Sequence, residues 1–362
     1  MDDPLSREPL SISSGFESAV CRILDANLDR AREGLRIVED WCRFGLNRRD
    51  LTEQCKNMRQ ELAAWHTPEL RAARDTPGDL GTQLSHPNEE NRRDVTHVLQ
   101  ANLCRIEEAL RVLEEYGKLY RAGMGESFKQ MRYQVYALDS TLMGQQRKQL
   151  LERSLLYLVT SSGEQLFSAV EAALQGGLTL VQYRDKEADD VTRIENGTRL
   201  RELCHRYGAL FIMNDRADLA RAVDADGVHL GQQDIPIALA RQILGSNRIV
   251  GRSTTNPEEM SRALSEGADY IGVGPIHATP TKEGKAAVGY DYVRHAVAHS
   301  SVPWFAIGGI DTENLDDLLS AGASRVAVVR AIMQAEHPTL ITQYFLAQLR
   351  QAQMMRSPQS SH

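Results

Sequence analysis

The 362-residue sequence lacks the features that would take a protein out of a reducing compartment. No apolar run reaches the roughly twenty residues that a membrane-spanning helix needs. The five cysteines are scattered and form no CxxC pair, so neither a disulfide framework nor a zinc site is indicated. The N-terminus, MDDPLSREPL, is acidic, whereas a secretory signal begins with basic and then apolar residues. We therefore expect a cytoplasmic protein with no membrane partner.

Basic residues are outnumbered by acidic ones. The chain has 42 lysines and arginines against 49 aspartates and glutamates, which gives a formal charge of −7. A nucleic-acid-binding protein would normally carry a basic face or stripe, so we expect no nucleic-acid partner. Small phosphorylated substrates are compatible with this charge. A few local cations and backbone N–H groups are enough to hold them.

One helical pattern occurs twice in the first part of the chain. The stretch ANLDRAREGLRIVEDWCRF (26–44) returns 75 positions later as ANLCRIEEALRVLEEYGKL (101–119), with eight of nineteen positions identical. In both copies apolar residues recur at spacings of three and four, which is typical of an amphipathic helix. Prolines and glycines in residues 76–88 interrupt any helix between them. We predict an all-α bundle of two related hairpins over residues 1–148.

The two copies also share polar residues that lie off the apolar seam. These residues form either i,i+3 pairs on a solvated face, which stabilise a helix by only about 0.2–0.5 kcal/mol each, or a buried polar network or ligand site. The shared residues are Arg30, Glu33 and Arg36 in the first copy and Arg105, Glu108 and Arg111 in the second, together with Asn27 and Asn102.

Residues 149–362 follow a different pattern, in which eight short apolar runs alternate with helical stretches that end in glycine. Eight such units in about 200 residues are typical of a (β/α)8 TIM barrel. The predicted fold is therefore α/β, with a TIM barrel preceded by the helical bundle. We expect the boundary between the domains in the polar stretch from 144 to 152.

Polar residues follow several of the predicted strands, and the active site of a barrel lies at the C-terminal ends of its strands. After LTLV, strand alternation sends Gln182, Arg184 and Lys186 to one side. Two cations and an amide on one face suit a polyanion. The alternative is a solvated strand end.

Candidate metal ligands follow the next two strands. FIMND ends in Asn214 and Asp215, and Asp234 follows VHLG. Carboxylates from adjacent strands above a phosphate site are suitable ligands for Mg²⁺, which completes its octahedron with water and substrate oxygens. The alternative is that either aspartate caps the helix that follows it. Ser253, in GRST, ends the fifth run.

The last three strands indicate a second anion site. Thr279, Thr281 and Lys282 lie on a polar segment that could close over substrate. Gly308 and Gly309 follow the seventh strand and VVRAI follows the eighth, which is the usual phosphate position of such barrels. Two phosphate sites in one barrel mouth imply a reaction that joins two phosphorylated molecules or rearranges a doubly phosphorylated one.

The motifs QYRDK, MND, GQQD, GRST, ATPTK and AIGGI occur in the order found in the thiamine-phosphate synthase family, over residues 154–349. The sequence resembles this family, and the resemblance implies a Mg²⁺-dependent condensation. Hydroxymethylpyrimidine diphosphate would react with a thiazole phosphate to give thiamine phosphate and pyrophosphate.

The resemblance also implies roles for single residues. Arg184, Lys186, Ser253 and Lys282 would be catalytic, and Mg²⁺ would be held by Asp215 and Asp234. The pyrimidine diphosphate would be bound by Gln182, Arg184, Lys186 and Asn214, with Ser253 and Lys282 at the pyrimidine or its leaving group. The thiazole phosphate would be bound by Thr279, Thr281 and Gly309, together with Val329 and Arg330, where the family often has serine in place of Arg330.

Rival functions follow from the same pattern. A thiazole tautomerase would shift protons only, with His277 as acid or base, and would need no diphosphate site. A sugar-phosphate isomerase barrel has no matching set of motifs here. A non-catalytic regulator of the thiamine pathway would not need every metal and phosphate position filled.

The helical half is similar to the domain fused ahead of some bacterial synthases, which has been suggested to act as an alternative pyrimidine-phosphate kinase. It contains no P-loop and no GxGxxG. The loop at 74–82, with Asp75 and Asp79, either holds phosphate or Mg²⁺ or simply joins two helices. Three roles stay open for this half: a kinase, a regulatory or substrate-binding module, or a dimerisation bundle that would make the protein a homo-oligomer.

Overall fold

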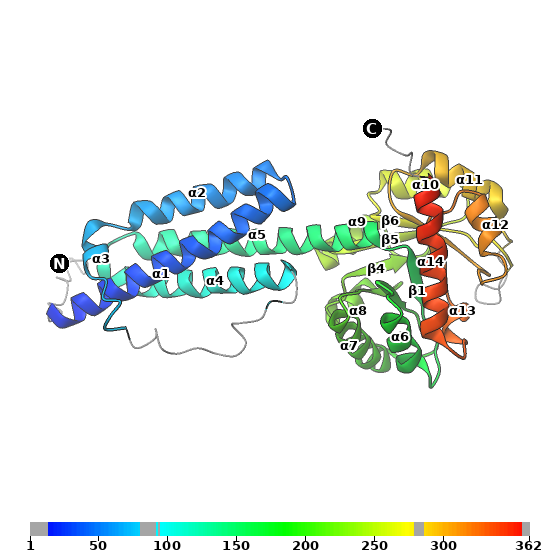
Figure 1. Cartoon of the computed structure of the whole chain (residues 1–362), viewed down its shortest axis with the longest axis horizontal. Coiled ribbons are helices and arrows are strands. Elements are labelled where there is room, and N and C mark those ends of the chain that lie inside the picture. Colours follow the sequence, from blue (N-terminus) through cyan, green and yellow to red (C-terminus); the bar gives the residue numbers. More distant parts are fainter. Residues whose placement is uncertain (1–13, 80–91, 93–94, 279–285, 357–362) are drawn as a thin grey trace, which may run out of the picture. The chain divides into compact units, whose positions relative to one another are not determined.

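The computed structural model describes residues 14–79, 92, 95–278 and 286–356. The chain divides into two compact units, Met1–Leu142 and Met143–His362 (Figure 1). The limit between the units falls inside helix α5 (Met124–Arg153). The division proposed from the sequence, at 148/149, lies in the same helix.

In the described part of the first unit, every secondary-structure element is a helix, as predicted. The apolar seams of the two repeats form one core, in which Leu28 and Leu35 of the first copy and Leu110 of the second are fully buried. The repeat helices approach closely, since a Cβ atom at Gly34 would lie 2.7 Å from Ile106 Cγ1. Its helices are α1 (Ser14–Asp40), the π-helical turn η1 (Trp41–Gly45), α2 (Arg49–Trp65), α3 (Pro68–Ala72), α4 (Val95–Tyr120) and the first part of α5.

Some of the polar residues shared by the repeats have structural partners. Asn27 and Asn102 each donate a side-chain hydrogen bond of 2.8 Å to the carbonyl four residues earlier. Glu39 accepts a bond of 2.6 Å from Arg59, and its counterpart Glu114 accepts one of 2.8 Å from Arg132. Each hairpin therefore contains one buried glutamate that is neutralised by an arginine of a neighbouring helix.

The repeated Arg-Glu-Arg sets do not form a buried network. All six side chains are exposed, so the solvated-face interpretation describes them. Arg36 pairs with Asp40 at 3.1 Å and Arg111 with Glu115 at 3.0 Å, both at i,i+4 on one helix. Such exposed pairs contribute little to stability.

The second unit contains, in the described part of the chain, eight parallel strands that close into a barrel in sequence order. Strand β1 pairs with both β2 and β8, which completes the closure and confirms the TIM-barrel prediction. The strands are almost wholly buried, as expected where helices cover the outside of a parallel sheet. They are β1 (Leu156–Val159), β2 (Leu180–Tyr183), β3 (Leu210–Asn214), β4 (Gly227–Leu230), β5 (Ile249–Thr254), β6 (Tyr270–Val273), β7 (Trp304–Ile307) and β8 (Val326–Val328).

Helices separate the strands along the chain. Asp189 caps α7 through a 2.8 Å bond from Thr192 N, and Asn256 caps α10 through a 2.9 Å bond from Glu259 N. The helices are α6 (Leu166–Gln175), α7 (Asp190–Arg206), α8 (Ala217–Ala222), α9 (Ile237–Leu244), α10 (Pro257–Ser265), α11 (Gly289–His299), α12 (Leu315–Ser320), α13 (Arg330–Met333) and α14 (Pro338–Arg356). Among the described helices of the whole chain, none is long and apolar enough to cross a membrane.

The barrel interior is filled by side chains, so the barrel is closed beneath its mouth. Tyr157, Tyr270 and Phe305 form an aromatic group there, with ring centroids 5.2–5.8 Å apart and edge-to-face geometry. Leu180 and Ile212 belong to the same buried cluster. Residues two positions further along each strand therefore face the mouth.

Candidate active site

The mouth of the barrel contains a cavity of about 640 Å³. Strand register explains its lining, because alternate residues at the C-terminal ends of neighbouring strands point inward to the same place. The loops that follow β2, β3 and β4 complete the wall. Eight of the residues predicted from the sequence lie on it: Gln182, Arg184, Lys186, Asn214, Asp215, Asp234, Ser253 and Val329.

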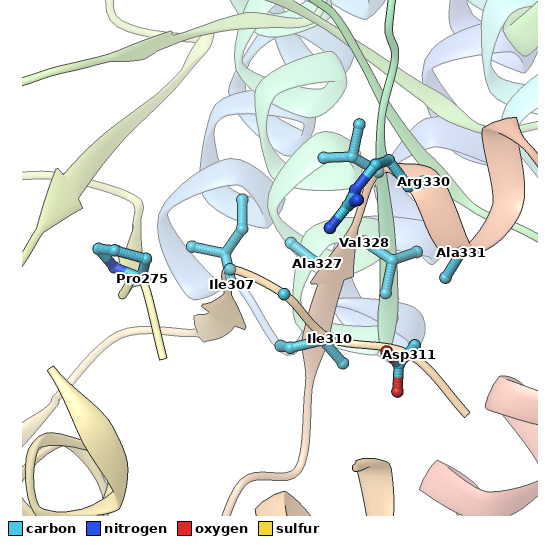
Figure 2. Close-up of a pocket in the computed structure, with 11 residues that line it drawn as sticks. Pro275, Ile307, Ile310, Asp311, Ala327, Val328, Arg330 and Ala331 are labelled. Atoms are coloured by element: carbon cyan, nitrogen blue, oxygen red, sulfur yellow. The ribbon is translucent and has the colours of Figure 1, made fainter. Parts of the chain in front are cut away.

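A second cavity, of about 290 Å³, adjoins the first at the ends of β7 and β8 (Figure 2). The predicted residues Gly309, Val329 and Arg330 line it. Gly309 has a φ of 63°, and a Cβ atom there would lie 2.9 Å from His277 Cβ. Only glycine fits this position without strain, so the backbone stays uncovered where the predicted phosphate would bind. Both cavities share Ile307, Ala327 and Val329, so two ligands bound there would meet.

Two carboxylates lie close together on the wall of the first cavity. Asp215 adopts a φ of 62°, which is unusual for a residue other than glycine, and its N–H donates a 2.8 Å bond to His229 O. Asp234 is held by a 2.5 Å bond from Gly231 N. Burial, and then the nearby Asp234, raise the pKa of Asp215, while Lys186, with Nζ 3.7 Å away, opposes this rise. A bound cation would relieve this repulsion, so the pair fits a divalent metal ion.

The loop after β2 is fixed by its own hydrogen bonds. Asp185 Oδ1 accepts bonds from the N–H groups of Glu187 (3.0 Å) and Ala188 (3.1 Å). Arg193, on α7, donates to Asp185 O at 2.9 Å and to Lys186 O at 3.0 Å. The backbone that carries Lys186 is therefore held in place before any anion binds.

A chain of buried hydrogen bonds runs beneath the cavity from Gln182 to Ser253. Gln182 Nε2 donates to the Tyr157 hydroxyl at 2.6 Å, and this hydroxyl lies 2.7 Å from that of Tyr270. The Tyr270 hydroxyl lies 3.0 Å from His229 Nδ1, and His229 Nε2 lies 2.9 Å from Ser253 Oγ. Because the amide N–H can only donate, the Tyr157 proton points to Tyr270, and the Tyr270 proton to Nδ1. His229 then donates from Nε2 to Ser253.

Tyr157, His229 and Tyr270 were not among the residues predicted from the sequence. Burial raises the pKa of both tyrosines, so they remain protonated donors. The sequence evidence for a functional role of these three residues was weak, because one tyrosine or histidine in an apolar strand is usually a packed core residue. The one available indication was that they point into the barrel, as Gln182 and Ser253 do.

Some predicted residues do not contribute to the described site. Thr279, Thr281 and Lys282 lie outside the described residues. His277 is described and lines neither cavity. Its ring packs edge-on against Tyr290, with Nε2 3.4 Å from the Tyr290 hydroxyl. His277, which the tautomerase hypothesis would use as acid or base, therefore does not line either cavity.

Comparison with known families agrees with the division into two units. The family model described as thiamine monophosphate synthase matches residues 156–332, and the one described as the ThiD2 family matches residues 22–141. The second match covers most of the described helical unit and says nothing of its chemistry.

Similar proteins extend over nearly the whole chain. A thiamine-phosphate synthase of Nostoc sp. is 68% identical over 94% of this chain and 97% of its own length. One from Synechocystis sp. is 64% identical over 92% and 97%. The solved structure of a thiamine phosphate pyrophosphorylase from Pyrococcus furiosus is 36% identical, with a TM-score of 0.51, over 57% of this chain and 98% of that one. The chain therefore belongs to the thiamine-phosphate synthase family of transferases, which make thiamine phosphate.

Proposed function

We propose that the barrel mouth condenses hydroxymethylpyrimidine diphosphate with a thiazole phosphate and that the reaction depends on Mg²⁺. The observation that carries this proposal is the convergence of the Asp215–Asp234 pair with Arg184 and Lys186 in one cavity beside a second, glycine-lined cavity. The first cavity suits a diphosphate and the second a monophosphate. Asp215 and Asp234 would hold Mg²⁺, which would supply positive charge for the diphosphate.

The protein's part in the reaction is positioning and charge stabilisation. The C–O bond between the pyrimidine methylene and the diphosphate breaks, and its electron pair leaves with pyrophosphate. The aminopyrimidine stabilises the resulting cation, and the lone pair of the thiazole nitrogen forms the new C–N bond. Arg184 and Lys186 stabilise the charge that develops on the leaving group, and no nucleophilic side chain is required.

The remaining contacts orient the two rings. Gln182, Asn214 and Ser253 bind the pyrimidine, and the hydrogen-bond chain through His229 holds Ser253 in place. Gly309, with the backbone of Val329 and Arg330, receives the thiazole phosphate. Thr279, Thr281 and Lys282 are proposed to join them, with Lys282 at the leaving group.

The test is thiamine phosphate formation from the two purified substrates and Mg²⁺ in the Asp215→Asn and Asp234→Asn variants. Each should lose activity by about 10²–10³, the usual effect of removing one charge-stabilising group. Excess Mg²⁺ should restore part of it, because the remaining carboxylate still binds weakly. Activity within threefold of the unchanged protein would contradict the metal assignment. Turnover of a thiazole phosphate alone, with no condensation, would favour the tautomerase instead.

For the helical unit, the kinase, the binding module and the dimerisation bundle stay predictions. These three roles can be distinguished in experiments on the full chain, with its barrel inactivated by Asp215→Asn. ATP-dependent phosphorylation of hydroxymethylpyrimidine phosphate would support the kinase, and binding of that compound without turnover would support the module. An inert, stable dimer would support the bundle. We place the protein's reactions in the cytoplasm.

A further inference from the structure

A buried polar cluster lies in the helical unit, far along the chain from the residues of the barrel mouth. Asp25 and Asp29 are one turn apart on α1, His66 directly follows α2, and Arg74 follows α3. One ligand atom from each of Asp25, Asp29 and His66 lies within 4.8 Å of the others. Asp25 and His66 are only 3% and 5% exposed, so this is a structured site and not a surface group of acids.

The hydrogen bonds of Asp25 hold the His66 ring in one orientation. Asp25 accepts bonds from Arg74 at 2.8 and 3.0 Å and from His66 Nε2 at 2.6 Å. Because Nε2 makes the bond to Asp25, Nδ1 is the ring nitrogen left for another partner.

That nitrogen is the unexplained atom of the cluster. His66 Nδ1 is buried and has no hydrogen-bond partner among the residues that the structure describes. It faces Asp29 Oδ1 at 3.6 Å, which is too long for a hydrogen bond. Two ligands on one tetrahedral metal ion with bonds of about 2.1 Å are about 3.4 Å apart. The gap between Nδ1 and Oδ1 is therefore close to the spacing that a shared metal ion requires.

The internal repeat shows that packing does not require these carboxylates. At the matching positions of the second copy, 75 residues on, Gln100 replaces Asp25 and Cys104 replaces Asp29. The structural pairs built on Asn27 and Glu39, in contrast, recur in the second copy. The two aspartates are thus specific to the copy that lies beside His66.

We propose that His66 Nδ1 and Asp29 Oδ1 bind a divalent transition-metal ion, with Asp25 as the carboxylate that orients His66. A metal-binding histidine usually donates its other ring N–H to a carboxylate, and the Asp25 bond supplies this second interaction. A mixed nitrogen and oxygen set suits Mn²⁺ better than Mg²⁺, which prefers oxygen ligands alone. Asp29 is 31% exposed, so water or a phosphate oxygen can reach the remaining positions.

Two arginines share this site with the metal ion. Arg74 contacts Asp29 at its other oxygen, Oδ2, so Oδ1 stays available. Arg32 Nη1 lies 3.7 Å from Oδ1 and competes with the ion for it. Both cations lower the affinity for a metal ion and would also attract a phosphate ligand of that ion.

The test is a titration of the full chain with Mn²⁺, in which the electron paramagnetic resonance signal of free Mn²⁺ is the readout. Asp215→Asn and Asp234→Asn are present in every sample, so that the proposed barrel metal site does not contribute. One Mn²⁺ should bind, and Asp29→Asn and His66→Gln should each weaken binding at least tenfold. Asp25→Asn should weaken it about 10–100-fold, as loss of a carboxylate behind a metal-bound histidine does. Mg²⁺ should compete poorly.

Two further variants distinguish a metal site from a structural ion pair. Glu114→Gln changes a buried carboxylate of the other hairpin and should leave Mn²⁺ binding unchanged. Arg74→Ala removes a competing cation and should tighten binding, whereas a purely structural cluster would gain no metal affinity from it. Absence of Mn²⁺ binding in the background protein, or unchanged binding in folded Asp29→Asn protein, would overturn the proposal. Asp29 is partly exposed, so that variant tests the site without depending on the tolerance of buried His66.

Discussion

The helical unit repeats one helix pattern twice and the barrel repeats a strand–helix unit eight times, and in both the repeated residues build the fold. In the barrel, eight equivalent strand–helix units bring unlike polar residues to one cavity, so function resides in what differs between the units. In the helical unit, the polar residues that recur in both copies are either exposed or locked in structural pairs such as Glu39 with Arg59. The residues found in one copy alone, Asp25 and Asp29, meet His66. In both units, the non-repeated polar residues are the better guide to a site.

The largest expected effect concerns the barrel mouth. Arg184→Ala removes a cation from the diphosphate position and should lower kcat for condensation by about 10²–10³. Steady-state assays with both substrates and Mg²⁺ measure this. Arg294→Ala is the matched control, because Arg294 is exposed on α11 and pairs with Asp291 at 2.6 Å. Equal losses in the two variants would show that the effect is not local to the mouth.

The next effect tests the structural residues of the repeat. Glu39→Ala leaves Arg59 without its buried partner and should lower the free energy of unfolding of the helical unit by about 2 kcal/mol. Glu33→Ala, at an exposed position of the same repeat, should change it by less than about 0.5 kcal/mol. Urea unfolding followed by circular dichroism compares them. Similar values for both would contradict the distinction between buried and exposed repeat residues.

A smaller effect concerns the hydrogen-bond chain beneath the cavity. Tyr270→Phe leaves His229 Nδ1 without its donor and should reduce kcat about tenfold, a cost of about 1.4 kcal/mol, with little change in the Mg²⁺ requirement. Tyr292→Phe breaks a comparable buried bond of 2.7 Å to Thr254, which is not part of the chain from Gln182 to Ser253. It should lower stability and leave kcat unchanged. A loss of kcat in both variants would assign the Tyr270 effect to general stability.

The smallest effect is the pH dependence of the helical unit. Burial raises the pKa of Glu114, but Arg132 and Arg111 outweigh burial, so this pKa lies below its ordinary value of 4.5. The unfolded state then binds protons more tightly, so this stabilisation is present above pH 4.5 and is lost as pH falls through the folded pKa. Glu114→Gln should make the stability of the unit less dependent on pH as the pH falls below about 4.5. Parallel pH profiles for the two proteins in urea unfolding would contradict this.

Much of the barrel could be predicted because, in this topology, a residue's position at the end of a strand determines where in the fold it lies. A polar residue at the end of a parallel strand faces the mouth in any such barrel, so Asp215 and Asp234 could be paired without knowing a single contact. The chain through Tyr157, His229 and Tyr270 could not be predicted. It depends on which side chains of β1, β4 and β6 meet in the interior, and these strands are not neighbours.

The helical unit was harder to predict for a related physical reason. Periodicity shows which face of a helix is buried, and it identified the seam correctly. It does not show that the turn after α2 brings His66 back to Asp25, 41 positions earlier, or that Arg74 closes over the pair. Whether the repeated charges are solvated also depends on what packs beside them.

The central claim is that the carboxylate pair and cations of the barrel mouth perform a Mg²⁺-dependent condensation. The most direct measurement is thiamine phosphate formation from hydroxymethylpyrimidine diphosphate and thiazole phosphate by the purified full chain, with Mg²⁺ and with a chelator. We expect steady formation of thiamine phosphate and equal amounts of pyrophosphate with Mg²⁺, and loss of both in the chelator and in the Asp215→Asn, Asp234→Asn double variant. Absence of product with Mg²⁺, or full activity in the double variant, would contradict it.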